Sequence, residues 1–185
     1  MGRTLFTKQA ISRRVGELAT EIARDCGREK DLAVVGILNG SFMFAADLVR
    51  GLYSHGTRVV LDFMVLSSYG SGTKSSGKVK VEKDAAMSVK GKRVLLVDDI
   101  LDTGLTLAKA KAHLLSKGAA EVKLCVLLDK PSRRKSRIRA DYAGFRMKDV
   151  FVIGYGLDFD SRYRELPFIA ELAREKKPRR PRNSP

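Results

Sequence analysis

The sequence predicts an α/β domain in which an open, mostly parallel sheet is flanked by helices. Two observations support this prediction. Short apolar runs alternate along the chain with segments of helical periodicity. The apolar runs also lack the polar alternation of half-exposed strands, as expected for parallel strands that are buried on both faces. The 185 residues, 44% of them hydrophobic, are enough for one such domain with its own core.

The elements can be placed one by one from these patterns. Apolar residues at helical spacing between Ile11 and Ile22 predict the first helix, which Gly27 should end. Ser41 is expected to cap the second helix. The predicted helices cover residues 8–26, residues 42 to about 52, and a segment from about 105, and the predicted strands cover residues 32–38, 58–66, 79–84, 94–97 and 121–128.

The composition limits the cellular compartment and the kinds of binding partner that we expect. The formal net charge of +15 suits anionic partners, either phosphorylated substrates or nucleic acid, and does not choose between them. Two cysteines without metal-site spacing argue against a disulfide framework and fit a cytoplasmic protein. No signal-peptide core or 18-residue apolar run occurs, so we expect no membrane span. His55 and His113 are given no role.

The segment 94–107, VLLVDDILDTGLTL, is the densest functional signal. Its apolar strand leads into Asp98 and Asp99, and a third acid, Asp102, follows. Ligands bind at the carboxyl ends of parallel strands, where a following helix also directs unpaired amides. The carboxylates could bind ribose hydroxyls or Mg²⁺, and the neighbouring amides could bind a phosphate, so the segment suits a phosphorylated sugar. The alternative is an ordinary loop with a capped helix. The amides expected to cradle the phosphate belong to Thr103, Gly104, Leu105 and Thr106.

This segment resembles the phosphoribosyl-pyrophosphate signature of the type I phosphoribosyltransferases. Members acting on adenine, orotate or uracil usually carry a small, aliphatic or aromatic residue at the position of Asp102, so an acid there points to the 6-oxopurine branch. The resemblance implies that Asp102 is the catalytic residue that takes or shares the N7 proton of the base. Matching segments run in the family's order from about Gly36 to Leu166.

Two further loops resemble those of hypoxanthine and hypoxanthine-guanine phosphoribosyltransferases. The segment Leu38, Asn39 and Gly40 matches a loop whose amides hold pyrophosphate through a strained, often cis, peptide. The family usually has Lys or Arg at the position of Asn39, so this chain lacks that cation; a plain Asn-Gly turn is the alternative. Ser68 and Tyr69 match the mobile loop that closes over the reacting centre.

The resemblance also assigns the base and metal contacts. Lys130 would donate to the purine 6-oxo group, and Phe151 would stack on the base. Val152 would accept from the base through its carbonyl, and Arg164 would contact pyrophosphate. Two Mg²⁺ ions are implied. Asp98 and Asp99 would hold ribose hydroxyls and a metal-bound water, and the other metal ligand would be Asp158.

Two segments are strongly basic. The run Arg133, Arg134, Lys135, Arg137 and Arg139 is interpreted as a solvated face or an RNA-attracting patch rather than as part of catalysis. Residues 173–185 are expected to form a disordered basic tail with non-specific RNA contacts. The remaining residues, 1–172, would form one phosphoribosyltransferase domain, with a small hood built from the N-terminal region and about 129–170.

The resulting prediction is a purine-salvage enzyme. It would transfer 5-phosphoribosyl from phosphoribosyl pyrophosphate to hypoxanthine and guanine, giving IMP or GMP and pyrophosphate, as a homo-oligomeric dimer or tetramer. The sequence does not rank hypoxanthine, guanine and xanthine. One alternative is a regulator of the same fold that binds RNA and uses nucleotide as an effector. Another is a phosphoacceptor receiver domain, whose acidic pair normally lies near the chain start.

Overall fold

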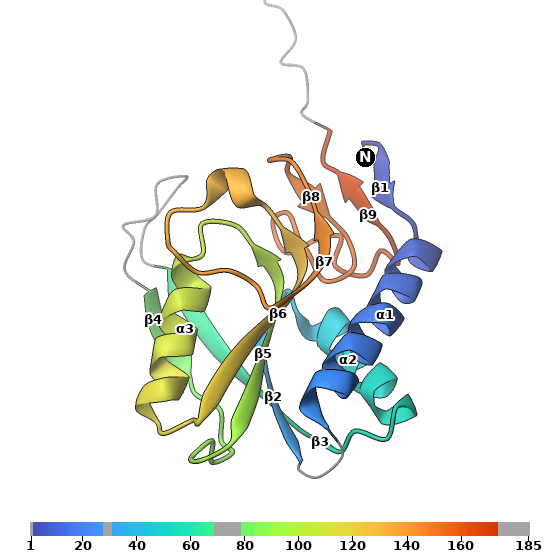
Figure 1. Ribbon diagram of the computed structural model, residues 1–185. Helices are drawn as coiled ribbons and strands as arrows, with labels where there is room; N and C mark the ends of the chain where they lie inside the picture. Colours follow the sequence, from blue (N-terminus) through green and yellow to red (C-terminus); the bar gives the residue numbers. More distant parts are fainter. Residues whose placement is uncertain (1, 28–30, 69–78, 174–185) are drawn as a thin grey trace, which may run out of the picture.

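The computed structural model describes residues 2–27, 31–68 and 79–173, with Ser68 described by its backbone alone. Figure 1 shows the arrangement of the elements. The α-helices are α1 (Lys8–Cys26), α2 (Phe42–Ser54) and α3 (Leu105–Ser116), and a single 3-10 turn covers Pro131–Arg133. The strands are β1 (Thr4–Phe6), β2 (Leu32–Leu38), β3 (Val59–Ser68), β4 (Val79–Lys83), β5 (Arg93–Leu101), β6 (Glu121–Asp129), β7 (Tyr142–Arg146), β8 (Val152–Ile153) and β9 (Ile169–Glu171).

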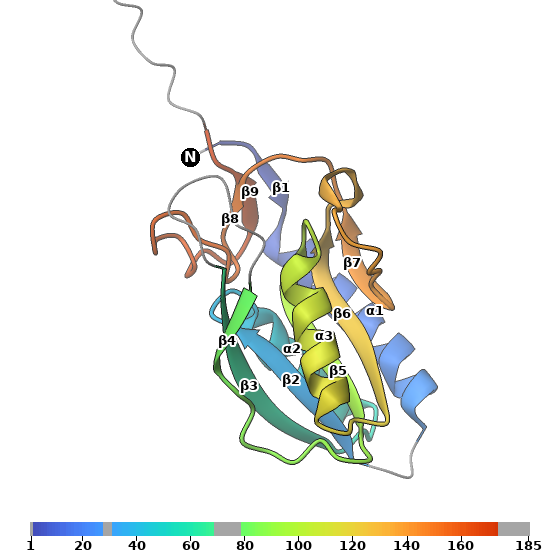
Figure 2. The same cartoon turned by 90° about the vertical axis from the view of Figure 1, so that its left-hand side faces the viewer.

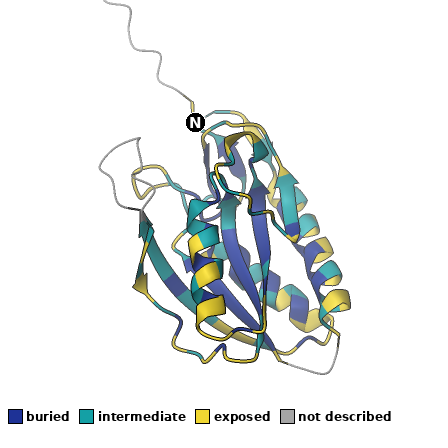
Figure 3. Cartoon of the chain, turned by 60° about the vertical axis from the view of Figure 1, so that its left-hand side comes forward, coloured by how far each residue is buried: buried dark blue, intermediate teal, exposed yellow. Residues whose placement is uncertain are grey.

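The main sheet has six strands in the order β4-β3-β2-β5-β6-β7. All neighbours are parallel except β3 and β4, which pair antiparallel at one edge. Helices α1 and α2 cover one face and α3 covers the other (Figures 1 and 2), and each face has its own apolar core. The buried positions concentrate on the central strands (Figure 3). The predicted fold class is confirmed.

A second sheet of three short strands, in the order β1-β9-β8, joins the two ends of the described chain. It lies beyond the carboxyl ends of the main strands, at the top of Figure 1. The segment 129–170, from which the hood was expected, divides between the two sheets, because β7 is the edge strand of the main sheet. Only β8 and β9 from the second half of the chain enter the small sheet.

Local chemistry explains most element boundaries. Thr7 caps α1 by accepting from the Ala10 amide at 3.2 Å, and Gly27 ends the helix with a φ of 68°. Ser41 occupies the N-cap position of α2, as predicted, but it makes no side-chain capping hydrogen bond. Its backbone is already helical, and its buried hydroxyl donates to the Ile37 carbonyl at 2.6 Å, which ties α2 to the preceding strand.

Strand β5 is longer than the apolar run predicted. Its ladder with β6 continues through Asp98, Ile100 and Leu101, so the acidic pair lies inside the strand rather than after it. The two acids interrupt the apolar run, so hydrophobicity alone ends the strand too early, although Asp98 and Leu101 are both buried. Tyr69 and residues 174–185, which include most of the predicted tail, lie outside the described residues. Within the described part, no helix is long and apolar enough to cross a membrane.

Candidate active site

The acidic pair Asp98–Asp99 lies at the carboxyl end of the central strand β5. Asp98 is 8% exposed, and its Oδ1 accepts from the Asp99 amide at 3.0 Å. Burial raises the pKa of Asp98 well above its usual range, and the neighbouring Asp99 carboxylate raises it further. Burial also raises the pKa of Asp99, against a smaller opposing effect of Arg164. Ionisation of both carboxyl groups is therefore unfavourable unless a ligand brings positive charge or hydrogen-bond donors.

Three separate segments meet at this pair. A Cβ on Gly40 would lie 1.7 Å from Asp99 Oδ2, so only glycine fits between the loop after β2 and the carboxylate. A Cβ on Gly156 would lie 2.1 Å from the Gly40 carbonyl oxygen, and Gly156 has a φ of +97°. The peptide between Leu38 and Asn39 is cis. The loop 38–40 thus lies directly against the acidic pair.

The turn from β5 into α3 leaves backbone amides without helical partners. Gly104 is left-handed, with φ 79° and ψ 1°, and the first-turn amides of α3 that follow it have no helical partner. The Leu105 amide makes only a long contact, 3.4 Å, with Thr103 Oγ1. The four residues Thr103–Thr106 therefore present amides near the acidic pair, in an arrangement suited to a phosphate group.

A network of alternating charges lies on the other side of this turn. Arg133 Nε is 3.1 Å from Asp102 Oδ1, and Arg133 Nη1 is 3.5 Å from Asp149 Oδ1. The Asp102 contact has ion-pair distance without hydrogen-bond geometry, so this buried Oδ1 accepts no hydrogen bond from the described residues. The carboxylate is thus charge-compensated while its oxygen keeps a free acceptor position.

Lys130 completes this network. Its side chain is 6% exposed, and Nζ donates to the Val150 carbonyl at 2.6 Å and lies 3.9 Å from Asp149 Oδ1. Burial lowers the pKa of Lys130, whereas the charges of Asp102 and Asp149 oppose that shift. The lysine is held at the end of β6 with one of its three donors committed, which leaves donors for a ligand.

The segment that follows Val150 supplies an aromatic surface. Phe151 is 55% exposed and meets Phe159 edge-on, with ring centroids 5.7 Å apart. A large aromatic residue exposed to this extent is not part of the core. Val152 is buried in β8, next to it.

The turn beyond β8 holds the last two predicted residues. Arg164 donates to the Gly156 carbonyl at 2.6 Å, and its Nη2 lies 2.9 Å from Asp158 Oδ1. The second oxygen of Asp158 accepts from the Ser161 amide at 2.9 Å. Through Gly156 and Gly40, this turn is in contact with the acidic pair.

Comparison with known proteins explains this arrangement. Residues 2–160 match the model of the phosphoribosyl transferase domain. The chain belongs to the phosphoribosyl transferase domain family. It is 48% identical to the hypoxanthine-guanine phosphoribosyltransferase of Aquifex aeolicus over 90% of this chain and 92% of the relative.

Solved structures agree with this membership. The hypoxanthine phosphoribosyltransferase of Staphylococcus aureus has a TM-score of 0.86 and 42% identity, covering 92% of this chain and 91% of that one. A hypoxanthine-guanine phosphoribosyltransferase of Bacillus anthracis, solved with a HEPES molecule in its active site, has a TM-score of 0.87 and 43% identity. That match covers 94% of this chain and 99% of the other.

The structure brings to the candidate site residues that the sequence analysis had not assigned to it. The interpretation of the basic run as a solvated face is wrong for Arg134, which is largely buried and pairs with Asp129. Arg133 is 47% exposed but pairs with Asp102. Asp149 and Gly156 were also missed. No periodicity marks Arg133, Asp149 and Gly156, because each contacts a partner that is distant in the sequence.

The acidic pair fits a divalent cation. Mg²⁺ takes oxygen ligands and is usually held by one or two carboxylates together with oxygens of a substrate phosphate. Asp98 and Asp99 offer such carboxylates. In Asp158 each carboxylate oxygen has one partner and keeps a free lone pair. Within the described residues, no group of three or more His, Cys, Asp or Glu side chains forms a metal cluster by itself.

Proposed function

We propose that this protein transfers the 5-phosphoribosyl group of phosphoribosyl pyrophosphate to hypoxanthine and guanine, giving IMP or GMP and releasing pyrophosphate. The names of relatives at 42–48% identity support the substrates. The observation that carries the proposal is Asp102, whose buried Oδ1 is compensated by Arg133 and free to accept a hydrogen bond.

The sugar phosphate would bind along the turn from β5 to α3. The amides of Thr103–Thr106 would hold the 5′-phosphate, since an orphan helix terminus favours anions. Asp98 and Asp99 would accept hydrogen bonds from the ribose hydroxyls. Each of these contacts orients C1′ of the ribose toward the base.

The leaving group would lie against the loop 38–40. The amides of Leu38, Asn39 and Gly40 are proposed to hold pyrophosphate, with Arg164 adding a cationic donor from the turn beyond β8. Asn39 contributes no charge at a position where a cation was expected. Ser68 and Tyr69 remain proposed closing-loop residues.

The base would lie on the other side of the turn. Lys130 would donate to the 6-oxo group, the exposed ring of Phe151 would stack on the purine, and the Val152 carbonyl would accept from its edge. As N9 forms its bond to C1′ and the bond to pyrophosphate breaks, the N7 proton would move to or be shared with Asp102.

We also propose a requirement for Mg²⁺. Asp98 and Asp99 would hold one ion through water, and Asp158 would be a ligand of a second ion. Bound there, Mg²⁺ would supply positive charge to neutralise the departing pyrophosphate. The three-stranded sheet β1-β9-β8 is proposed to act as a hood over the base. We further propose that the protein is a homo-oligomer, as the resemblance implies.

A single assay tests the reaction. The protein is incubated with phosphoribosyl pyrophosphate, Mg²⁺ and one of six bases (hypoxanthine, guanine, xanthine, adenine, uracil or orotate), and pyrophosphate release is measured. Turnover confined to 6-oxopurines is expected. Turnover with none of the bases would overturn the proposal in favour of the RNA-binding regulator, an alternative that receives no support from the relatives.

A further inference from the structure

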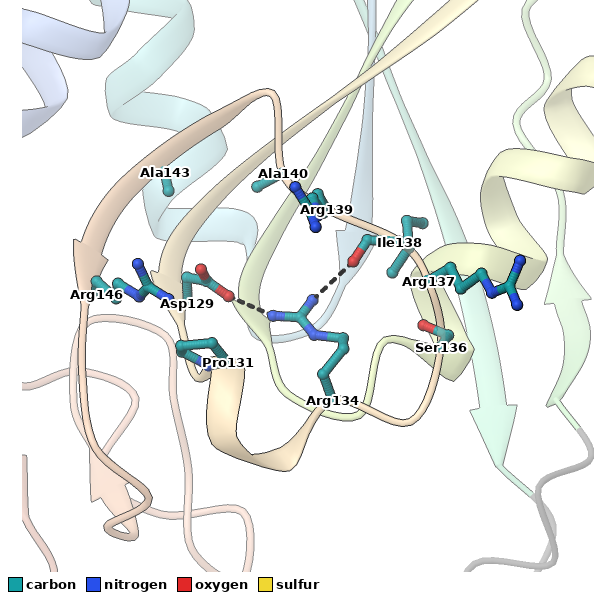
Figure 4. A pocket seen from close by; sticks show the side chains of 10 residues that line it. All are labelled: Asp129, Pro131, Arg134, Ser136, Arg137, Ile138, Arg139, Ala140, Ala143 and Arg146. Carbon is teal, nitrogen blue, oxygen red and sulfur yellow. Dashed lines mark hydrogen bonds and ion pairs between the residues drawn. The ribbon is translucent and has the colours of Figure 1, made fainter.

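A cavity of about 680 Å³ lies under the connection between β6 and β7 (Figure 4). It contains none of the residues assigned above to substrates or metal. Its volume falls within the range of small-molecule sites, roughly 300–1,000 Å³. It is lined by Asp129, Pro131, Arg134, Ser136, Arg137, Ile138, Arg139, Ala140, Ala143 and Arg146.

The cavity exists because this connection is not a helix. The chain leaves β6 through the turn Pro131–Arg133 and returns as an irregular segment to the start of β7. Helix α3 packs on the middle of the sheet, so the irregular segment covers the edge strand on that face. Small or apolar side chains form the inner wall: Pro131, Ile138, Ala140 and Ala143.

The cavity is strongly cationic. Four arginines line it against one carboxylate, Asp129, and that carboxylate is already paired with Arg134. Arg134 also donates to the carbonyls of Leu101 and Ile138, at 3.3 Å each. Arg139 and Arg146 form no ion pair with any described residue, and Arg146 stands beside Asp129 in the register of β6 and β7.

We propose that this cavity binds a small anion that carries a chain of two or more phosphate groups. Guanidinium groups recognise phosphate through paired hydrogen bonds, and neither Arg139 nor Arg146 forms an ion pair with a described residue, because Asp129 pairs with Arg134 instead. The apolar residues of the wall offer few hydrogen-bond partners to water, so the arginines would bind the anion with few ordered waters between them. Free oligophosphates and nucleotides share this chemistry.

An anion bound in this cavity should also affect the turn Thr103–Thr106, called here the phosphate-binding turn because it is proposed to hold the 5′-phosphate. The amides of Lys135 and Ser136 donate to the Thr103 carbonyl, at 2.9 and 3.3 Å. A Cβ on Gly104 would lie 2.4 Å from Ser136 Oγ and 2.6 Å from Ile138 Cγ2, so the cavity wall touches the turn. Occupancy of the cavity should therefore stabilise residues 103–106.

Calorimetric titration of the full chain, without divalent cations, tests the site. The probes are inorganic triphosphate and ATP, each added to the wild type and to the Arg139→Ala/Arg146→Ala double variant. Because two charge-assisted donors are lost, the double variant should bind at least about tenfold more weakly in one binding event. Any binding of the probe at the phosphate-binding turn should remain in the double variant. Of triphosphate and ATP, the probe that binds the wild-type cavity more tightly shows whether the natural ligand is a free oligophosphate or a nucleotide.

The matched control is Lys135→Ala/Lys148→Ala, which removes the same charge from two exposed positions close to the cavity in the sequence. Neither Lys135 nor Lys148 lines the cavity. This control should bind within about twofold of wild type. Equal weakening in both double variants would show a general effect of charge and overturn the proposal, as would unchanged binding in both.

A third variant keeps all the arginines. Ala140→Glu places a carboxylate on the cavity wall, where it should pair with the arginines and abolish the same binding event. Hydrogen exchange provides a second readout: triphosphate should slow exchange of the amides of residues 103–106 in the wild type and not in Ala140→Glu. Slowing of equal size in both proteins would place the anion at the turn itself and contradict the proposal.

Discussion

The two acidic groups of the site differ in how their charge is balanced. Asp98 and Asp99 are adjacent, and burial and mutual repulsion raise the pKa of Asp98 well above its usual range. Asp102 and Asp149, by contrast, share Arg133, and Asp149 also lies 3.9 Å from Lys130. Neither carboxylate of the first group forms an ion pair with a described residue, whereas the second group contains its own cations.

This difference suggests a division of labour. A buried carboxylate pair is suited to a ligand or metal that brings positive charge or hydroxyl donors with it. A compensated network is suited to a neutral ligand, because binding a purine there requires no additional counter-ion. The sugar-phosphate side should therefore depend on Mg²⁺, and the base side should depend on the protein's own charges.

The largest expected effect is that of Asp102→Asn. Loss of the acceptor for the N7 proton should lower kcat with hypoxanthine by roughly 10²- to 10⁴-fold, the range for one acid-base group. Steady-state kinetics with saturating substrates measures this. An unchanged kcat would remove Asp102 from the chemistry. Asp160→Asn, at an exposed position in a turn, is the control.

A smaller effect is expected for Lys130→Ala. Base binding should weaken by about 1–3 kcal/mol, because the 6-oxo acceptor would be left unpaired, and discrimination against 6-amino purines should relax. Lys130 also donates to the Val150 carbonyl, so thermal stability must be checked in parallel. If adenine stays excluded and hypoxanthine binds as before, the assignment is wrong.

Arg133→Gln should have a weaker effect still. Its side chain is 47% exposed, and ion pairs at such exposure are worth about 0–1 kcal/mol. We expect KM for the base to rise by about two- to fivefold, with kcat less affected and with partial rescue by Arg133→Lys. Arg137→Gln, which removes an arginine that forms no ion pair among the described residues, should change neither constant. Equal effects of the two glutamine variants would rule out a specific role for Arg133.

The smallest effect concerns stability without ligand. Because the folded pKa of Asp98 is raised above its ordinary 3.8, the folded state binds more protons, and the wild type loses stability as pH rises from about 4 toward the raised pKa. Asp98→Asn removes that loss and can still accept from the Asp99 amide. Its Tm should exceed the wild type's by roughly 2–6 °C at pH 7.5, with the difference disappearing near pH 4. A lower Tm at pH 7.5 would show that the pair is not repulsive.

The sugar-phosphate side could largely be predicted from the sequence because its residues are contiguous. Asp98 to Thr106 lie on one strand and one helix start, and both elements follow from the apolar run and the Gly104 position. The extension of β5 through the acids could not be predicted, since the two carboxylates interrupt the apolar run before the pairing with β6 ends.

The base side was much harder to predict. Lys130, Arg133 and Asp149 come together because the chain turns after β6 and returns after β7, and no periodicity encodes that contact. The basic composition of residues 133–139 suggested a solvated face, whereas tertiary pairing places Arg133 against Asp102. The contact of Gly156 with Gly40 likewise depends on the packing of two distant loops.

The division of labour is tested most directly by the dissociation constant of phosphoribosyl pyrophosphate, measured by calorimetry with Mg²⁺ in the wild type, Asp98→Asn and Asp102→Asn. Because Asp98 and Asp99 would hold the ribose and the cation, Asp98→Asn should weaken binding by about tenfold or more. Asp102→Asn should stay within about twofold of wild type despite its loss of turnover. Equal weakening in the two variants, or weakening confined to Asp102→Asn, would contradict the account.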